Sequence, residues 1–85
     1  MNKLFSDDAW NDYLYWQQND KAKLKRINKL IKSIECDGYS SGIGKPEALK
    51  HNLSGYWSRR INDEHRIIYK ILEHNIYIAS CKDHY

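Results

Sequence analysis

The sequence has few of the residues that mark a secreted, membrane-spanning or cofactor-binding protein. Its 85 residues include only two cysteines, Cys36 and Cys81, and the N-terminus shows no signal-peptide pattern, which excludes a secreted disulfide framework. No apolar run approaches the ~20 residues of a membrane span. No Cys/His cluster has zinc-ligand spacing, and no glycine-rich loop matches a nucleotide cradle. We therefore expect a soluble cytoplasmic protein with reduced thiols and without metal or cofactor.

The chain is too short for a second hydrophobic core, and its charge is unevenly distributed. Its length predicts a single domain over residues 1–85. The formal net charge is only +3, but residues 21–32 contain six lysines and arginines and no acidic residue. Such a block attracts a polyanion, because binding releases condensed counterions. The alternative explanation is the solvated face of a helix.

Two helices are predicted in the first half of the chain. Ser6 is a suitable N-cap, and apolar residues recur at helical spacing over residues 7–18. A second apolar stripe, from Leu24 to Ile34, predicts a basic amphipathic helix over residues 21–35. The connector is so short that the two helices should form an antiparallel hairpin. A basic amphipathic helix can also lie on a membrane, but here its apolar stripe is needed to cover a sheet.

In the second half of the chain, residues alternate between two faces, as is typical of β-strands. Residues 36–44 carry three of the four glycines and predict a loop, and strands are predicted over residues 56–61, 66–72 and 76–81. Short turns make these strands antiparallel neighbours. We expect a meander sheet with one face under the helices and the polar members of the alternation on the other. Residues 3–5 are too few to assign alone, although they could form a strand.

Ionisable residues of the second half could cleave RNA without a metal. In that reaction the 2′-hydroxyl attacks the adjacent phosphorus, so a base, an acid and cations are needed. Glu47 is the candidate base. His84 is the candidate acid, because an unperturbed histidine titrates near a pKa of ~6.5. The other candidates would bind phosphate or, for the terminal tyrosine, stack on a base or donate a hydrogen bond: Lys50, Arg60, Arg66 and Tyr85.

Each of these residues also has an ordinary structural explanation. A lone loop glutamate is usually solvated, and strand arginines usually form surface pairs, as Arg59 could with Asp63 or Glu64. The remaining histidines fit turn or surface positions: His51, His65 and His74. Residue spacing by itself therefore indicates a basic, aromatic chain directed at RNA and goes no further.

Several motifs add to this interpretation. The most specific are Lys45-Pro46-Glu47 and the terminal His84-Tyr85, and others fall within residues 10–17, 25–32, 44–61, 64–66 and 79–85. In these motifs the chain resembles the YoeB toxins (the Txe/YoeB family), within the RelE-like group of bacterial toxin–antitoxin systems; the loop at 36–43 matches weakly. The resemblance implies an α+β, RelE-like microbial RNase-like fold. Such a fold has a twisted, mainly antiparallel four-stranded sheet, in which the N-terminal strand is one of the four. An N-terminal helical hairpin covers one face of this sheet.

The same resemblance implies a function. Members of the family cleave messenger RNA in the ribosomal A site, leaving a 2′,3′-cyclic or 3′-phosphate and a 5′-hydroxyl. By position, Glu47 is similar to the general base and His84 to the general acid. Arg66 resembles the phosphate-stabilising arginine, and Tyr85 the tyrosine that completes the site. Further cations near the phosphate are expected at two positions: Lys50 and Arg60.

The resemblance also implies partners. These are a YefM-like antitoxin, the ribosome with its mRNA, a second copy of the chain in a homodimer, and operator DNA only through the antitoxin complex. One departure is Asp83, where the family often has an aromatic residue. Two alternatives remain open at this point. The chain could be a non-catalytic module that binds ribosomal RNA or acts as an antitoxin corepressor, or it could be a nuclease that needs no ribosome.

Overall fold

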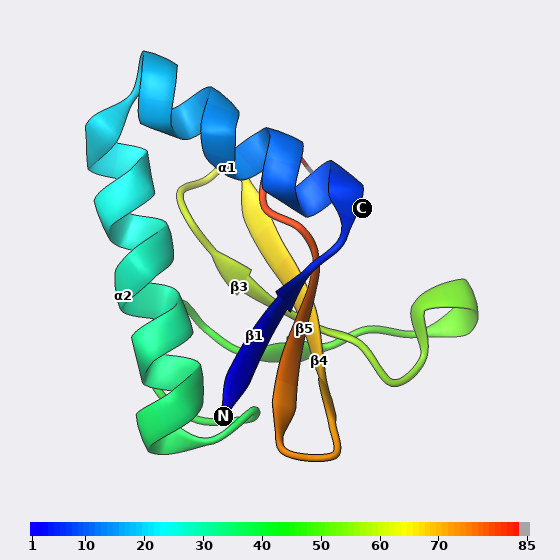
Figure 1. Cartoon of the computed structure of the whole chain (residues 1–85). Coiled ribbons are helices and arrows are strands. Elements are labelled where there is room, and N and C mark those ends of the chain that lie inside the picture. Colours follow the sequence, from blue (N-terminus) through cyan, green and yellow to red (C-terminus); the bar gives the residue numbers. More distant parts are fainter. Residues whose placement is uncertain (84–85) are drawn as a thin grey trace.

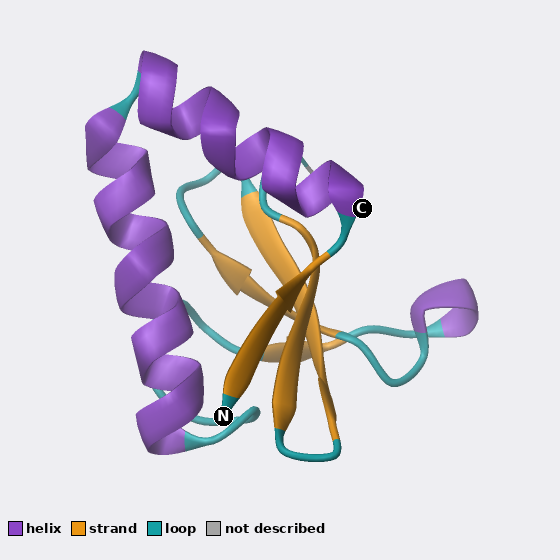
Figure 2. Ribbon diagram, in the orientation of Figure 1, coloured by secondary structure: helices purple, strands orange, loops and turns teal. Residues whose placement is uncertain are grey.

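The computed structural model describes residues 1–83, and the predicted site residues His84 and Tyr85 lie outside the described part. The fold is α+β, with two helices against one sheet (Figure 1). The sheet has the strand order β1-β5-β4-β3-β2. Figure 2 shows the helices on one side of the strands and a short helical turn, η1, that stands out from the body. The bounds are β1 Asn2–Phe5, α1 Asp7–Asn19, α2 Lys21–Asp37, β2 Glu47–Ala48, η1 His51–Leu53, β3 Trp57–Arg60, β4 Arg66–Leu72 and β5 Asn75–Ser80.

Both predicted helices form, and side-chain caps set where they begin. Ser6 Oγ accepts the Ala9 N–H at 3.0 Å at the start of α1. Asp20 ends α1 and caps α2, where its carboxylate accepts the backbone N–H of Ala22 and of Lys23. The helices meet at this residue as a splayed hairpin, with α2 alongside the sheet and α1 across one end of it (Figure 1). Within residues 1–83, no helix is both long and apolar enough to span a membrane.

The sheet has five strands, so the predicted count of four was one too low. The predicted antiparallel meander is confirmed as β3, β4 and β5. The N-terminal strand joins the sheet by pairing in parallel with β5. The additional strand is β2, which pairs Glu47 with Ser58 and Ala48 with Trp57. This strand has only two residues, which follow a glycine and a proline and precede a helical turn. Two residues are too few to show an alternation, so only the pairing reveals the strand.

The predicted alternation of β3 and β4 separates the two faces of the sheet. Ile61, Ile67 and Tyr69 belong to the core beneath the helices. Residues between them along the strands, such as Arg60 and Arg66, project from the opposite face. The helices and strands together bury this cluster of side chains: Ala9, Trp16, Ile27, Leu30, Ile31, Ile34, Ile61, Ile67, Tyr69, Ile76, Ile78 and Cys81.

Arg59 does not form the predicted surface pair with Asp63 or Glu64. Its position in the alternation places it on the helix side of the sheet, where it is 0% exposed. Its Nε donates to Tyr69 Oη at 2.9 Å and its Nη1 to Ser33 Oγ at 2.9 Å. It also donates to three carbonyl oxygens of the loop that follows α2: Gly38, Ser41 and Ile43. The buried guanidinium therefore holds the loop that leads from α2 to Glu47.

The same loop needs a glycine where it crosses this arginine. Gly42 has a φ of +111°, and a Cβ there would overlap Ser33 Oγ and lie 2.9 Å from Arg59 Nη1. Tyr69 completes the arrangement by donating to the Tyr39 carbonyl at 2.6 Å. Burial raises the pKa of the Tyr69 phenol, although the Arg59 guanidinium acts in the opposite direction, so the phenol stays neutral and remains a donor.

Candidate active site

The proposed base, Glu47, lies on the sheet face opposite the helices. As the first residue of β2 it is directly opposite Ser58, which is in turn opposite Ile68 of β4. Directly paired residues of antiparallel strands point to the same face, so Glu47 shares this face with Arg60 and Arg66. Beside it an open hollow of about 500 Å³ is lined by residues 47–51. The hollow combines one carboxylate with two further polar groups, those of Lys50 and His51.

Two arginines lie opposite each other in the adjoining row of the sheet. Arg60 at the end of β3 pairs with Arg66 at the start of β4. Arg66 Nη1 donates to the carbonyl oxygens of Asn62 at 2.6 Å, Asp63 at 3.2 Å and His65 at 3.1 Å. These bonds orient the guanidinium and use only one of its nitrogens. Arg60 is exposed, and its Nη1 lies 3.9 Å from the Asp63 carboxylate.

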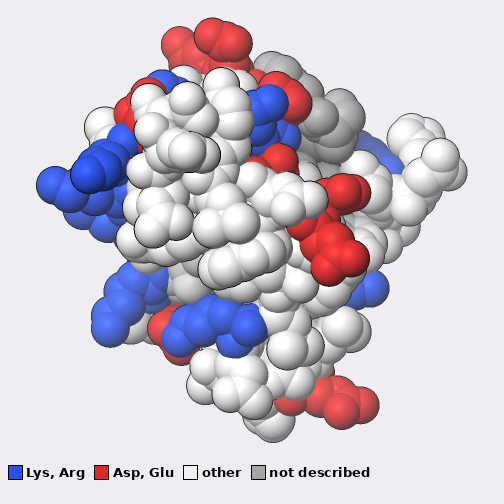
Figure 3. Space-filling model, turned by 45° about the horizontal axis from the view of Figure 1, so that its top comes forward, with Lys and Arg blue, Asp and Glu red and all other residues white. Residues whose placement is uncertain are grey.

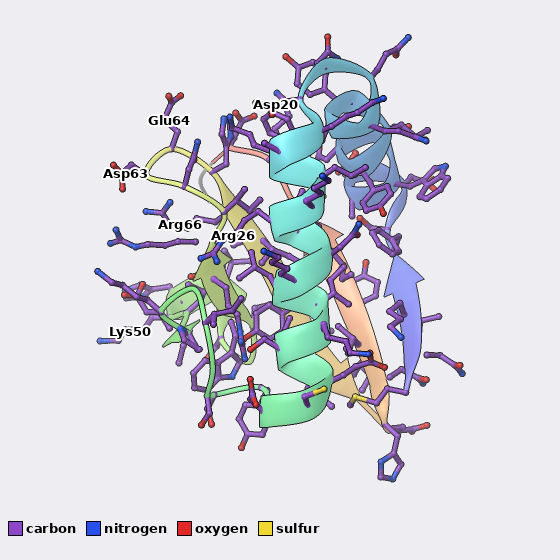
Figure 4. The ribbon with its side chains drawn as sticks, turned by 90° about the vertical axis from the view of Figure 1, so that its left-hand side faces the viewer. Asp20, Arg26, Lys50, Asp63, Glu64 and Arg66 are labelled. Atoms are coloured by element: carbon purple, nitrogen blue, oxygen red, sulfur yellow. The ribbon has the colours of Figure 1, made fainter. Side chains whose placement is uncertain are left out.

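The cations project from one side of the molecule. Figure 4 shows Arg66 and Lys50 pointing away from α2, on the side of the sheet far from β1, with Asp63 nearby. Lys50 is exposed and directly precedes η1. The structure thus brings the predicted phosphate-binding residues onto one face with Glu47. An anion on this face would meet positive charge from three elements: β3, β4 and the segment before η1.

His84 and Tyr85 are outside the described residues, but the segment that leads to them is described. Cys81 lies at the end of β5, and its carbonyl accepts the Trp16 Nε1–H at 2.8 Å. The last described residue, Asp83, accepts the Arg66 N–H through its carbonyl oxygen at 3.1 Å. The segment that ends at Asp83 therefore runs beside Arg66, the first residue of β4.

His65 lies in the turn between β3 and β4, as predicted, but it is not a surface residue. Its side chain is only 14% exposed and meets the Trp16 ring edge-on, with centroids 4.8 Å apart. No local pattern could indicate this contact, because Trp16 belongs to α1. A second residue without a predicted role is Lys70, whose Nζ lies 4.6 Å from the Tyr56 ring centroid and 5.6 Å from that of Tyr77. Lys70 is two residues from Ile68, and Ile68 is two residues from Arg66, so Lys70 lies on the face that carries Arg66.

No metal is indicated by the part of the chain that the structure describes, since residues 1–83 contain no cluster of three or more His, Cys, Asp or Glu side chains suited to a metal ion. The two thiols are both free. Burial raises the pKa of the Cys81 thiol to about 12, so it is neutral at physiological pH and unsuited to nucleophilic attack.

Comparisons with known proteins place this arrangement in a family. Residues 5–85 match the family described as the YoeB-like toxin of bacterial type II toxin–antitoxin systems. The chain belongs to the YoeB toxin family. A YoeB toxin from Synechocystis is 59% identical over 85 residues, covering 100% of this chain and 98% of that protein. The resemblance inferred from the motifs is thereby confirmed.

Solved structures of YoeB proteins share the whole fold. In the YoeB–YefM complex from Staphylococcus aureus, the matched chain is 56% identical with a TM-score of 0.94, covering 100% of this chain and 98% of that chain. The YoeB dimer from the same organism is 58% identical, with the same TM-score of 0.94 and the same coverage of 100% and 98%. YafQ from Escherichia coli has a TM-score of 0.73 at 19% identity over 96% of this chain and 91% of YafQ, a likeness of fold alone. The predicted RelE-like α+β class is confirmed.

In this YoeB-family chain, Asp12 anchors the C-terminal segment to α1. Its Oδ2 accepts the Cys81 N–H at 3.0 Å. Burial raises the pKa of the Asp12 carboxyl, while the hydrogen bond from Cys81 and the charge of Lys82 act in the opposite direction. Because its pKa is raised, the folded protein binds this proton more tightly than the unfolded chain does. The charged carboxylate therefore costs stability at neutral pH, and that cost disappears as the pH falls below the ordinary pKa of an aspartate.

Two variants of Asp12 should separate its charge from its hydrogen bond. We expect Asp12→Asn to be at least as stable as the native protein at pH 7, because an amide oxygen still accepts from Cys81 without a buried charge. The difference should close toward pH ~4. Asp12→Ala lacks the acceptor and should lose about 1 kcal/mol near pH ~4, but less at pH 7, where it is also relieved of the charge. Urea unfolding of the three proteins at both pH values measures this; an Asp12→Asn protein that is less stable than native at pH 7 would contradict it.

Proposed function

We propose that the chain is a ribosome-dependent endoribonuclease toxin that cleaves mRNA in the ribosomal A site and so inhibits translation. The observation that carries the proposal is the register of β2, β3 and β4, which gathers Glu47, Arg60 and Arg66 on the face of the sheet opposite the helices. A carboxylate beside paired guanidinium groups suits proton abstraction next to a phosphate. Membership of the YoeB toxin family supports the same function.

The chemistry divides among named groups. Glu47 takes the proton of the 2′-hydroxyl, whose oxygen attacks the adjacent phosphorus. Arg66, with Arg60 and Lys50, stabilises the charge that develops on the phosphoryl oxygens. His84 protonates the departing 5′-oxygen, which leaves a 2′,3′-cyclic phosphate on one fragment and a 5′-hydroxyl on the other. Water can then open the cyclic ester to a 3′-phosphate.

Two further features suit this reaction. The guanidinium of Arg66 is already oriented by the carbonyl oxygens of the turn before β4, so little reorganisation is needed when charge develops. Tyr85 completes the site, where its ring can stack on a base or its hydroxyl can donate a hydrogen bond. The proposed reaction uses side chains alone and needs no metal or cofactor.

The proposed partners follow from the solved relatives. YoeB of Staphylococcus aureus has been solved with YefM, and also as a dimer. We propose that this chain acts in the cytoplasm, is neutralised by a YefM-like antitoxin and self-associates as a homodimer. Contact with operator DNA would occur only through the antitoxin complex.

A basic surface along α2 favours RNA binding independently of cleavage. Figure 3 shows blue side chains gathered on the side where α2 lies, next to a wide uncharged area over α1. The exposed basic residues of this helix are Lys21, Lys25, Lys29 and Lys32. Such a surface suits the phosphate backbone of ribosomal RNA. A non-catalytic module that binds ribosomal RNA or acts as an antitoxin corepressor is therefore the second candidate function.

Ribosomes stalled with a defined codon in an empty A site test the proposal. Purified protein is added, message ends are mapped by primer extension, and naked message is treated in parallel. We expect a new end inside the A-site codon on ribosomes only. Cleavage of naked message at a comparable rate would make the protein a general nuclease. Binding to ribosomes without cleavage would support the non-catalytic candidate instead.

A further inference from the structure

The residue before His84 is fixed by hydrogen bonds on both sides of its α-carbon. The Asp83 N–H donates to His65 Nδ1 at 2.8 Å, and the Asp83 carbonyl accepts the Arg66 N–H at 3.1 Å. His65, just before β4, and Arg66, its first residue, therefore hold both peptide groups of Asp83. These contacts fix the backbone of the residue to which the proposed general acid is joined.

Asp83 adopts a backbone conformation that needs such support. Its φ is +62°, in the left-handed region that L-residues seldom occupy. Aspartate tolerates this region better than most residues, but an unsupported chain end would leave it readily for extended conformations. The two hydrogen bonds at Asp83 are thus what retains the turn. Of the two, only the one to His65 depends on a side chain that mutation can change.

The His65 ring is held in place by its surroundings. Its edge contacts Trp16, whose Nε1 donates to the Cys81 carbonyl. Its backbone is fixed as well: the His65 N–H donates to Asn62 Oδ1 at 2.7 Å, and its carbonyl accepts the Ile61 N–H at 2.9 Å. The ring therefore lies in a rigid turn against α1, with Nδ1 directed at Asp83.

His65 acts here as an acceptor and not as a cation. Its Nδ1 also lies 3.7 Å from the Asp83 carboxylate, a distance at which a protonated ring would form an ion pair. One nitrogen cannot accept the Asp83 N–H while carrying a proton of its own. The 2.8 Å hydrogen bond from the N–H is the closer contact, so Nδ1 serves as its acceptor.

We propose that His65 is a positioning residue for catalysis: through Nδ1 it fixes Asp83, the residue that precedes the proposed general acid in the sequence. The inference rests on the proposed function of His84. It assigns to His65 no contact with substrate. A catalytic acid displaced by about 1 Å can lose on the order of 10²-fold in rate, so a backbone anchor one residue away is enough to affect the chemistry.

Two substitutions separate the contribution of the aromatic ring from that of the hydrogen-bond acceptor Nδ1. His65→Phe keeps an aromatic ring against Trp16 but has no Nδ1. His65→Asn gives up the ring and keeps an oxygen near the position of Nδ1. Each full-length protein is measured for three properties: cleavage rate at saturating ribosomes, affinity for ribosomes, and the ¹⁵N amide signal and hydrogen exchange of Asp83. Thermal unfolding confirms that both variants are folded.

We expect His65→Phe to cleave at least about tenfold more slowly at saturation, with ribosome affinity within about twofold of native. Its Asp83 amide should shift and exchange faster, and His65→Asn should recover most of the rate and of the amide protection. A His65→Phe protein that cleaves at the native rate would overturn the proposal. So would a His65→Asn protein that stays as slow as His65→Phe, because the ring and not the acceptor would then matter.

The amide measurement keeps this inference separable from the proposed nuclease activity. If the native protein cleaves no message, the nuclease proposal fails while the Asp83 amide still reports on the anchor. Faster exchange in His65→Phe alone would then support the anchor. Equal exchange in all three proteins would refute the anchor even if cleavage is observed.

Discussion

Replacing Glu47 or His84 by glutamine should lower the single-turnover cleavage rate on ribosomes by about 10²–10⁴-fold. Glutamine keeps the length of Glu47 but is far too weak a base to take the 2′-hydroxyl proton. In place of His84 it can donate a hydrogen bond but cannot transfer a proton to the leaving oxygen. Ribosome affinity should remain near native for both, because each residue acts on the reacting atoms and the basic residues are untouched.

Matched controls are available in the turn between β4 and β5. Glu73 and His74 are both exposed and lie at the opposite end of β4 from Arg66 (Figure 1). Glu73→Gln and His74→Gln make the same chemical changes away from the proposed site and should cleave within about twofold of native, as surface substitutions generally do. A loss below tenfold for Glu47→Gln or His84→Gln would remove that residue from its proposed role.

The pH–rate profile adds an independent check on the same pair. An enzyme that needs one deprotonated and one protonated group shows a bell-shaped profile. Glu47→Gln should remove the rise on the acidic side and leave the fall on the alkaline side. His84→Gln should do the reverse. Profiles that keep both limbs in either variant would mean that other groups transfer the protons.

Local periodicity was sufficient to predict most elements of the fold. Helices over 7–18 and 21–35 were predicted, and the structure has Asp7–Asn19 and Lys21–Asp37. The three predicted strands are also present as β3, β4 and β5. In these segments one face is buried along the whole element, so the apolar periodicity can be recognised within a short stretch of sequence. β2 escaped prediction because two residues are too few for a pattern and its pairing is a long-range property.

The candidate site shows the same division between local and long-range information. The polar members of the alternation were expected on the face away from the helices, and the register places Arg60 and Arg66 there. Arg59 was expected to form a surface pair and is buried instead, in a loop that follows α2 and that nothing near Arg59 in sequence indicates. The role of His65 was hidden for the same reason, since its contacts come from α1 and from the C-terminal segment.

Replacing Arg59 by methionine should destabilise the protein by about 3–5 kcal/mol, a large part of the ~5–15 kcal/mol that a domain of this kind has in total. Methionine fills similar space but offers no donors. It removes all five hydrogen bonds that the guanidinium donates, three of them to carbonyl oxygens of the loop, although Ser33 and Tyr69 keep their bonds to Asp37 and Tyr39. Urea and thermal unfolding measure the loss, and a fall in melting temperature of more than about 10 °C is expected.

The neighbouring arginine provides the control. Arg60 is one residue away and equally charged, but it is exposed and its ion pair with Asp63 spans 3.9 Å. Arg60→Met should therefore change stability by less than about 1 kcal/mol. It should instead weaken cleavage on ribosomes, because the proposal places Arg60 beside the phosphate. The two variants should therefore differ in stability, with a large loss for Arg59→Met and almost none for Arg60→Met.

The loop that Arg59 binds leads to the proposed base, so Arg59→Met should also affect activity. Residues 38–44 lead directly into Pro46 and β2, and the Gly44 carbonyl accepts the Arg60 N–H at 2.7 Å. Releasing the loop should therefore also loosen Glu47, so the folded fraction of Arg59→Met should cleave more slowly than native. A protein that keeps the native melting temperature would mean that water or a rearranged loop satisfies the freed carbonyl groups. In that case the buried guanidinium of Arg59 would not be needed to hold the loop that leads to Glu47.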